Sequence, residues 1–153
     1  MSCHRFERTR GWLRSRAACA AIFVFLTTAC GGQYGSVRFD AAAGQALEAG
    51  VVLKGHRTVI AGPDNRSFIN LTGNAGMATG GTGDLLTGMI AAWFAQLLDA
   101  EAACKLAVYL HGTAGDLAEA DEGEVALTAG DMAERLGDAV LELTARRRVK
   151  RES

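Results

Sequence analysis

The clearest alternation of apolar and polar positions follows Asp84, in the second half of the chain. Apolar residues recur there every three or four positions, which is the period of one helix face. These positions are Leu85, Leu86, Met89, Ile90, Trp93, Phe94, Leu97 and Leu98. The stripe predicts a core helix that buries both aromatic side chains. Gly88 interrupts the stripe at a cost of about 1 kcal/mol relative to alanine, so we expect close packing or a ligand beside it.

Three short runs before this helix are typical of strands. Residues 51–53 and 58–61 are apolar and β-branched, and residues 67–70 follow a turn at 62–65 that contains the sole proline. We predict that the three runs pair as a small antiparallel sheet. The last strand would then lead directly into the segment before Asp84.

Alanine-rich segments predict further helices at 40–49 and 100–120. We expect Gly112 and Gly115 to interrupt the second helix. The same helix contains His111, which we interpret as a packed or hydrogen-bonded histidine, and Asp116, which would support the fold or the site from behind. Neither residue is assigned to the catalytic set.

The C-terminal part predicts one more amphipathic helix. A short extended piece at 125–127 precedes Thr128 and Asp131, which have the spacing of a capping box with Asp in place of Glu. Apolar positions then follow at Met132, Leu136, Val140 and Leu143. The basic tail at 146–153 is expected to be disordered.

A glycine-rich stretch connects the predicted sheet to the core helix. Five of the eleven residues 73–83, named here the glycine loop, are glycines, and glycine lets backbone amides approach a ligand closely. The loop opens into a helix N-terminus, whose free amides and positive dipole end favour phosphate. Asp84 either caps this helix or acts as a general base beside the anion, as in phosphoryl transfer to a hydroxyl. The spacing fits neither a Walker A loop nor the dinucleotide fingerprint.

Composition adds few constraints. The length of 153 residues suits one domain, the apolar fraction of 49% suffices for a core, and the net charge of −1 gives no indication of nucleic-acid binding. None of the four cysteines has zinc-ligand spacing. We expect Cys104 to be a buried, unreactive thiol in a reduced setting.

Residues 1–36 differ from the rest of the chain. Five arginines precede an apolar run from Ala17 to Ala29, and Cys30 follows it, which resembles a lipoprotein signal peptide. The run is too short to span a bilayer. Three interpretations stay open: an altered or misread N-terminus, a genuine export signal, and a lineage-specific helix.

Four motifs occur in a fixed order along the chain. They are Leu-Lys-Gly-His-Arg-Thr-Val-Ile at 53–60, Gly-Asn-Ala-Gly-Met-Ala-Thr-Gly-Gly-Thr-Gly-Asp at 73–84, Val-Tyr-Leu-His-Gly-Thr-Ala-Gly-Asp at 108–116 and Leu-Thr-Ala-Gly-Asp-Met at 127–132. Together they resemble the ADP- or ATP-dependent NAD(P)H-hydrate dehydratases of the ribokinase-like superfamily. The resemblance implies an α/β fold, a three-layer αβα domain truncated to its C-terminal half at about residues 37–145.

The activity implied by this resemblance is the repair of hydrated NADH or NADPH, a lyase reaction. ADP or ATP would phosphorylate the ring hydroxyl, and phosphate would then leave. Asp84 would be the catalytic base and contact the substrate, and Mg2+ would bridge the nucleotide phosphates without a metal site built by the protein. The nucleotide-binding residues implied are Lys54, Gly55, His56, Arg57, Thr58, Asn74, Ala75, Gly76, Met77, Ala78, Thr79, Gly80, Gly81, Thr82 and Gly83.

The partners implied by the resemblance are hydrated NADH or NADPH and ADP or ATP. Because such a site depends on cytoplasmic nucleotide, we expect a cytoplasmic protein, and the apolar edge of a truncated sheet favours a homo-oligomer. We expect neither nucleic acid nor a membrane as a partner. Alternative functions are a ribokinase-like small-molecule kinase and a nucleotide-binding fragment without chemistry. A third alternative is an exported lipoprotein, if residues 1–30 are a signal peptide.

Overall fold

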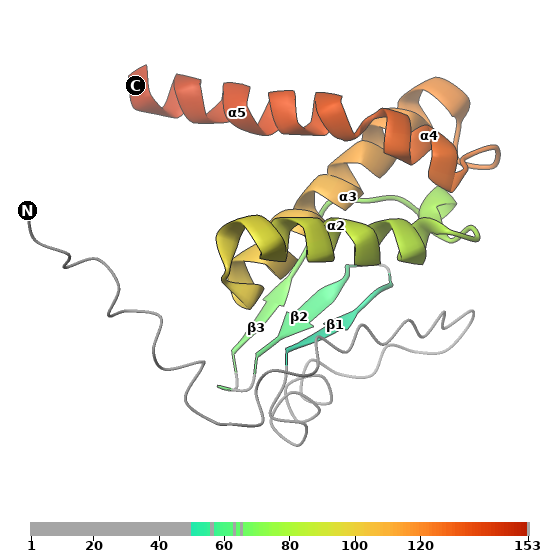
Figure 1. The fold of residues 1–153 in the computed structure, drawn as a ribbon. Coiled ribbons are helices and arrows are strands. Elements are labelled where there is room, and N and C mark those ends of the chain that lie inside the picture. The colour runs from blue at the N-terminus through green and yellow to red at the C-terminus, as the bar shows by residue number, and fades with distance from the viewer. Residues whose placement is uncertain (1–49, 56, 63, 65, 153) are drawn as a thin grey trace, which may run out of the picture.

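The structure, a computed structural model, describes residues 50–152 except His56, Pro63 and Asn65. The signal-like segment 1–36 and the helix predicted at 40–49 therefore lie outside the described residues. The described chain forms a three-stranded sheet followed by a short 3-10 turn and four helices. Figure 1 shows the helices stacked over one face of the sheet.

The sheet is antiparallel, as predicted. Strands β1 (Val51–Leu53), β2 (Val59–Ala61) and β3 (Ser67–Ile69) lie in sequence order. Val51 pairs with Ala61, and Val59 pairs with Ile69. Within the described sheet, β3 is thus an edge strand, and the chain leaves the sheet from its end.

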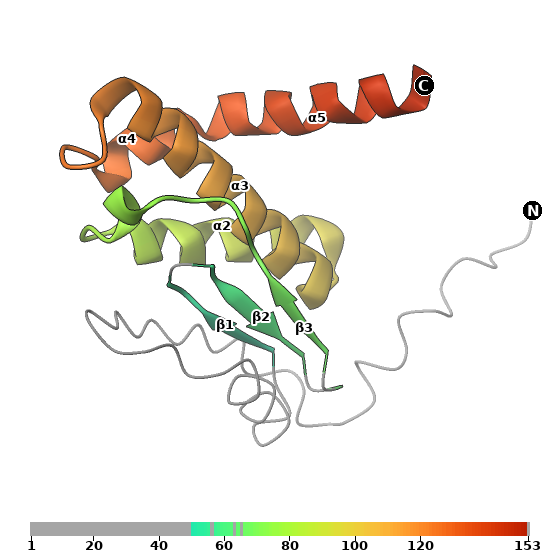
Figure 2. The ribbon, with the colours of Figure 1, turned by 180° about the vertical axis from the view of Figure 1, so that it is seen from behind.

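Helices α2 (Thr82–Leu97) and α3 (Ala100–Glu122) form the layer over the sheet, with α4 (Ala129–Glu134) and α5 (Leu136–Glu152) beyond them (Figures 1 and 2). The main core joins apolar side chains from the sheet and from three helices. Its fully buried members include Val52, Leu86, Ile90, Val108, Leu110 and Ala139. The layer is held to the sheet by this shared apolar burial.

Helix α3 is continuous, so the predicted interruption at its glycines is wrong. A Cβ at Gly112 would lie 2.1 Å from Oγ1 of Thr72, and one at Gly115 would lie 2.4 Å from Sδ of Met77. The glycines let the incoming loop approach the helix, and Figure 2 shows this segment running beside α3. Their propensity cost of about 1 kcal/mol each is offset by that packing.

The stripe on α2 is buried only in its first half. Leu86, Met89 and Ile90 are in the core, and Trp93 is half-buried against it. Phe94, predicted to be buried, is 38% exposed because it lies in the last turn, near the end of the helix at Leu97. A Cβ at Gly88 would have no described atom within 4 Å, so packing by the described residues does not account for this glycine, and a ligand beside it stays a prediction.

The C-terminal part agrees with the sequence at one point and differs at three. The single helix predicted through Met132 and Leu143 is divided, because α4 ends at Glu134 and α5 begins at Leu136. Thr128 and Asp131 form the predicted capping box at the start of α4. Residues 124–126 form a turn rather than an extended piece. Helix α5 continues to Glu152, so the tail is helical rather than disordered. Arginine and lysine are good helix formers, and no glycine or proline follows Gly137.

Candidate active site

Among the described residues, no side chain caps the N-terminus of α2. Its N-cap residue is Gly81, with φ +86°, and the first helical bond runs from the Leu85 N–H to the Gly81 carbonyl at 3.0 Å. The amides of Thr82, Gly83 and Asp84 therefore have no partner within the helix. Free amides at the start of a 16-residue helix are a site for an anion.

Asp84 lies in the first turn of this helix with its side chain exposed. It is not the N-cap and makes no capping bond, so the interpretation as a simple cap is wrong. Within the part of the chain that the structure describes, its carboxylate makes neither a hydrogen bond nor an ion pair. An exposed carboxylate beside an anion site is placed to accept a proton from a bound hydroxyl.

The segment that leads into the glycine loop is bonded to α3. The Asn70 amide donates to the Val108 carbonyl at 3.4 Å, and the Thr72 hydroxyl donates to the Tyr109 carbonyl at 3.1 Å. Both acceptors lie inside the helix and use a second lone pair. Because Gly112 has no side chain, the backbone at Thr72 can lie directly against α3.

Asp116 holds the start of the glycine loop. Its carboxylate accepts the Gly73 N–H at 2.9 Å and the Asn74 amide at 3.2 Å. The same Asn74 amide donates to the Gly115 carbonyl at 2.9 Å. Asp116 thus belongs to the support of the site, as expected from the sequence, and its carboxylate is occupied by the loop.

The middle of the loop is tied to the sheet and to α2 through one carbonyl. Met77 ends the short 3-10 turn η1 (Ala75–Met77), and its oxygen lies 3.3 Å from the Lys54 ammonium and 3.0 Å from the Thr82 hydroxyl. The Thr82 hydroxyl also lies 3.0 Å from the carbonyl of Thr79. Burial lowers the pKa of Lys54, whose side chain brings a cation from the end of β1 against the loop.

His111 holds the end of the loop. Its ring is buried, and Nε2 lies 2.8 Å from the Thr82 carbonyl oxygen, which can only accept, so Nε2 carries the proton. Burial lowers the pKa of His111 to about 4, with nearby Lys54 acting in the same direction and the Thr82 bond opposing it. The histidine is therefore neutral near pH 7, which confirms the expectation of a hydrogen-bonded core residue.

The predicted nucleotide residues form two groups. Lys54 and the loop come together at Met77. Gly55, Arg57 and Thr58 form the turn between β1 and β2, where the Thr58 hydroxyl donates to the Gly55 carbonyl at 3.2 Å and Arg57 has φ +60°. Neither Gly55 nor Arg57 has a described bond to the loop, and His56 lies outside the described residues.

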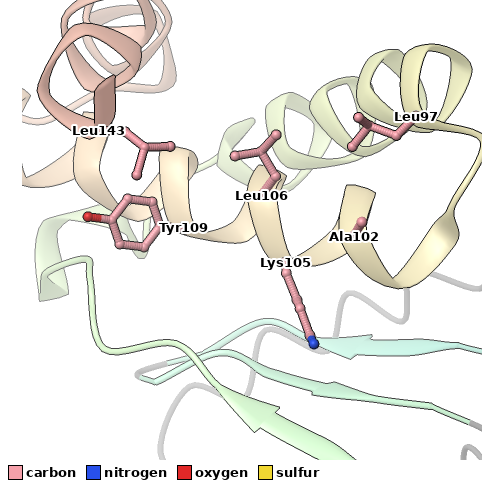
Figure 3. Close-up of a pocket in the computed structure, with 6 residues that line it drawn as sticks. All are labelled: Leu97, Ala102, Lys105, Leu106, Tyr109 and Leu143. Atoms are coloured by element: carbon pink, nitrogen blue, oxygen red, sulfur yellow. The ribbon is translucent and has the colours of Figure 1, made fainter. Parts of the chain in front are cut away.

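An apolar pocket of about 380 Å³ lies elsewhere, between the end of α2, α3 and α5 (Figure 3). Its lining residues are Leu97, Ala102, Lys105, Leu106, Tyr109 and Leu143. Leu97 is the last residue of α2, so this end of the pocket is roughly 20 Å along the helix from its free amides. No side chain that lines the pocket has a described hydrogen bond to the glycine loop.

Two further properties of residues 50–152 bear on binding partners. No three His, Cys, Asp or Glu side chains among those described gather as ligands for a metal ion. The described helices include none with the length and apolar character needed to cross a membrane.

Known proteins are similar to this chain in sequence. The profile of the NAD(P)H-hydrate dehydratase family matches residues 23–137. A bifunctional NAD(P)H-hydrate repair enzyme of Thermofilum pendens is 54% identical over 82 residues, which cover 54% of this chain and 16% of that protein. An ADP-dependent (S)-NAD(P)H-hydrate dehydratase of Neisseria meningitidis is 47% identical over 92 residues, which cover 59% of this chain and 31% of that protein.

Solved structures of proteins from this family and superfamily are similar to this chain in fold. An ADP/ATP-dependent NAD(P)H-hydrate dehydratase of Bacillus subtilis, co-crystallized with ATP and Mg2+, superposes with a TM-score of 0.67 at 36% identity. The match covers 69% of this chain and 38% of that one. A ribokinase-like superfamily protein of Enterococcus faecalis has a TM-score of 0.57 at 37% identity, over 66% of this chain and 34% of that one. The described fold is therefore ribokinase-like, and the chain spans well under half the length of these relatives.

Proposed function

The chain belongs to the NAD(P)H-hydrate dehydratase family, and on this premise we propose that it acts in the ADP- or ATP-dependent dehydration of hydrated NADH and NADPH. One observation carries the proposal. The glycine loop ends in an uncapped helix N-terminus with an exposed carboxylate, Asp84, in its first turn. This arrangement joins an anion site to a proton acceptor, as phosphoryl transfer to a hydroxyl requires.

The loop amides bind and stabilise the phosphoryl group. Amides of residues 79–83 lead directly into the free amides of the first turn of α2, so negative charge on the transferring group meets donors that are already in place. Lys54 adds a positive charge against the loop. We assign residues 54–58 and 74–83 to the nucleotide, and one contact between the two groups supports this assignment, the bond from the Lys54 ammonium to the Met77 carbonyl.

Asp84 acts as the general base. It takes the proton of the ring hydroxyl while that oxygen forms a bond to the terminal phosphorus of the nucleotide, and the bond from phosphorus to the leaving nucleotide oxygen breaks. Hydroxide is a poor leaving group, whereas phosphate leaves readily from the ester so formed, as the lone pair of the ring nitrogen displaces it from carbon. The neighbouring ring carbon then gives up a proton to solvent and the double bond is restored. The ring thereby loses the elements of water, and its hydroxyl oxygen leaves in the inorganic phosphate.

The donor set fits Mg2+ that arrives with the nucleotide. Magnesium in nucleotide sites is commonly held by phosphates and one or two carboxylates. Asp84 serves as the proton acceptor, and no three His, Cys, Asp or Glu side chains among those described gather as metal ligands, so the nucleotide phosphates would hold the ion. When bound, the ion would neutralise phosphate charge. The loop amides bind the phosphoryl group, and Asp84 accepts the proton.

The test of the proposal compares Asp84→Asn with Asp138→Asn. Asp138 is also an acidic residue in the first turn of a helix, α5, so it controls for the effect of a carboxylate on a helix dipole. We expect Asp84→Asn to lose at least about 100-fold in turnover of hydrated NADH, the usual contribution of a general base. Its nucleotide affinity should stay close to that of the unaltered chain, and Asp138→Asn should keep both properties.

Three outcomes of that assay are informative. Retained turnover in Asp84→Asn would remove Asp84 from the mechanism. A stable phosphorylated product would instead indicate a small-molecule kinase. Nucleotide binding by the unaltered chain without turnover would indicate a nucleotide-binding module that performs no chemistry.

We further propose a cytoplasmic, self-associating protein. A reaction that consumes ADP or ATP depends on the nucleotide pool of the cytoplasm. Self-association is supported by apolar side chains that are exposed at the end of α2 and on α5, namely Leu97, Leu98 and Leu141. Analytical sedimentation of the purified chain measures its oligomeric state and thereby tests self-association.

A further inference from the structure

We infer that His111 and Asp116 are positioning residues that fix the two ends of the glycine loop on helix α3. The inference rests on the proposed function, because it concerns the nucleotide at the same site. Neither side chain touches the reacting atoms. Each acts through the loop backbone, and together they set where the loop amides lie before any nucleotide binds.

The first end is fixed by a carboxylate with two separate acceptors. Asp116 Oδ2 accepts the Gly73 N–H at 2.9 Å, while Oδ1 accepts the Asn74 amide at 3.2 Å. Hydrogen bonds to a charged acceptor are stronger than neutral ones. Gly73 has φ +104°, so this bond also holds the backbone in a conformation that few residues other than glycine adopt.

The second end is fixed by a neutral imidazole. His111 donates from Nε2 to the Thr82 carbonyl at 2.8 Å, at the first residue of α2. The bond sets the position of the helix turn whose amides face the anion. Both partners are buried, with His111 at 3% and Thr82 at 2% exposure, so water does not compete for it.

The span between the two ends is kept in contact with the same helix. His111 and Asp116 are five residues apart, which is about 7.5 Å along a helix. Gly112 and Gly115 lie between them, and Met77 packs where a Gly115 side chain would be. The Met77 carbonyl then bonds to Thr82 and Lys54. The loop is therefore held at its start, its middle and its end.

This attachment matters because the loop is rich in glycine. Glycine loses more backbone freedom on ordering than any other residue, and binding must supply the free energy for any ordering that it requires. A loop already ordered by α3 presents its amides without that cost. Loss of either positioning residue should therefore weaken nucleotide binding even where the chain stays folded.

The experiment uses five variants of the full chain. His111→Leu removes the donor to Thr82, and His111→Gln supplies an amide donor in its place. Asp116→Leu removes both acceptors, and Asp116→Asn keeps one. The control is Thr113→Val, which changes a buried hydroxyl on the same helix that has no hydrogen-bond partner among the described residues.

Two measurements are made on each folded variant. The dissociation constants of MgATP and MgADP are measured by equilibrium titration, because the midpoint of a binding curve does not depend on the fraction of protein that is active. Amide hydrogen exchange of residues 73–83 is measured without nucleotide. In the Leu variants we expect a rise in the dissociation constant of about tenfold or more, which is the loss of one buried or charged hydrogen bond, together with faster exchange in the loop.

The conservative variants make the result specific. His111→Gln should recover most of the affinity, Asp116→Asn should be intermediate, and Thr113→Val should match the unaltered chain in both measurements. Unchanged loop exchange and unchanged affinity in folded Leu variants would overturn the inference. If a Leu variant does not fold, equal behaviour of Asp116→Asn and the unaltered chain would overturn it instead. A chain that binds no nucleotide while its variants show faster loop exchange would contradict the proposed function and leave the positioning role supported.

Discussion

The buried imidazole of His111 couples the stability of the protein to pH. Burial lowers its pKa from 6.5 to about 4 in the folded chain, while in the unfolded chain it keeps its ordinary value. Between these values the unfolded state binds a proton that the folded state does not. The free energy of unfolding should therefore be highest above pH 6.5 and fall as the pH drops from 6.5 to 4.

We predict that this one group lowers the free energy of unfolding by up to about 3 kcal/mol across that interval. Urea unfolding at a series of pH values measures it, with His111→Gln as the reference because glutamine does not titrate. Carboxylates titrate in both proteins, so the difference between the two curves isolates the histidine. Parallel curves would show that His111 has an ordinary pKa in the folded chain.

Single residues were predictable where burial follows from a local pattern. Cys104 lies in an alanine-rich helix and is 5% exposed, with burial raising the pKa of its thiol to about 11. His111 was recognised as a packed residue for the same reason. Phe94 was not, because the apolar period of a helix does not tell where along its length the covering elements end.

Gly88 in α2 and Gly112 in α3 both lie within helices, but replacing them should change the stability of the protein in opposite directions. Gly112 is where the backbone at Thr72 meets α3, and a Cβ there would come within 2.8 Å of backbone atoms that cannot move independently. Gly88 on α2 has no described neighbour within 4 Å of the corresponding position. An identical substitution should therefore destabilise one helix and stabilise the other.

We predict that Gly112→Ala lowers the free energy of unfolding by about 1–3 kcal/mol, the usual cost of overpacking. Gly88→Ala should raise it by up to about 1 kcal/mol through helix propensity. Chemical denaturation of the two variants and the unaltered chain gives both values. A loss of stability in Gly88→Ala would indicate that something packs against α2 at this point.

Elements were predictable where the determinants are close in sequence. The three strands follow from β-branched runs and one turn, and the cap of α4 follows from Thr128 and Asp131. The continuity of α3 through Gly112 and Gly115 was not predictable, since it depends on Thr72 and Met77, which are distant in the sequence. The same holds for the bonds of Asp116 to the start of the glycine loop, which join two elements that the sequence separates.

The candidate site consists of residues that are contiguous in the sequence, whereas the residues that hold it in place come from elements far away in the sequence. The glycine loop and Asp84 were recognisable from the sequence because an anion site at a helix start is built from contiguous residues. That Lys54, His111 and Asp116 lie around this loop is seen only in the folded structure, where the end of β1 and helix α3 contact the loop. The described residues supply the sheet and the helices on one of its faces, and the chain aligns with 38% of the Bacillus subtilis dehydratase.

The central claim is that this chain dehydrates hydrated pyridine nucleotides with ADP or ATP. The most direct measurement incubates the purified full-length chain with hydrated NADH and Mg2+, with ADP and ATP in parallel, and follows the return of reduced-nicotinamide absorbance. We predict recovery that requires nucleotide and that is lost in Asp84→Asn. No recovery with either nucleotide, in a sample that demonstrably binds the nucleotide, would contradict the claim.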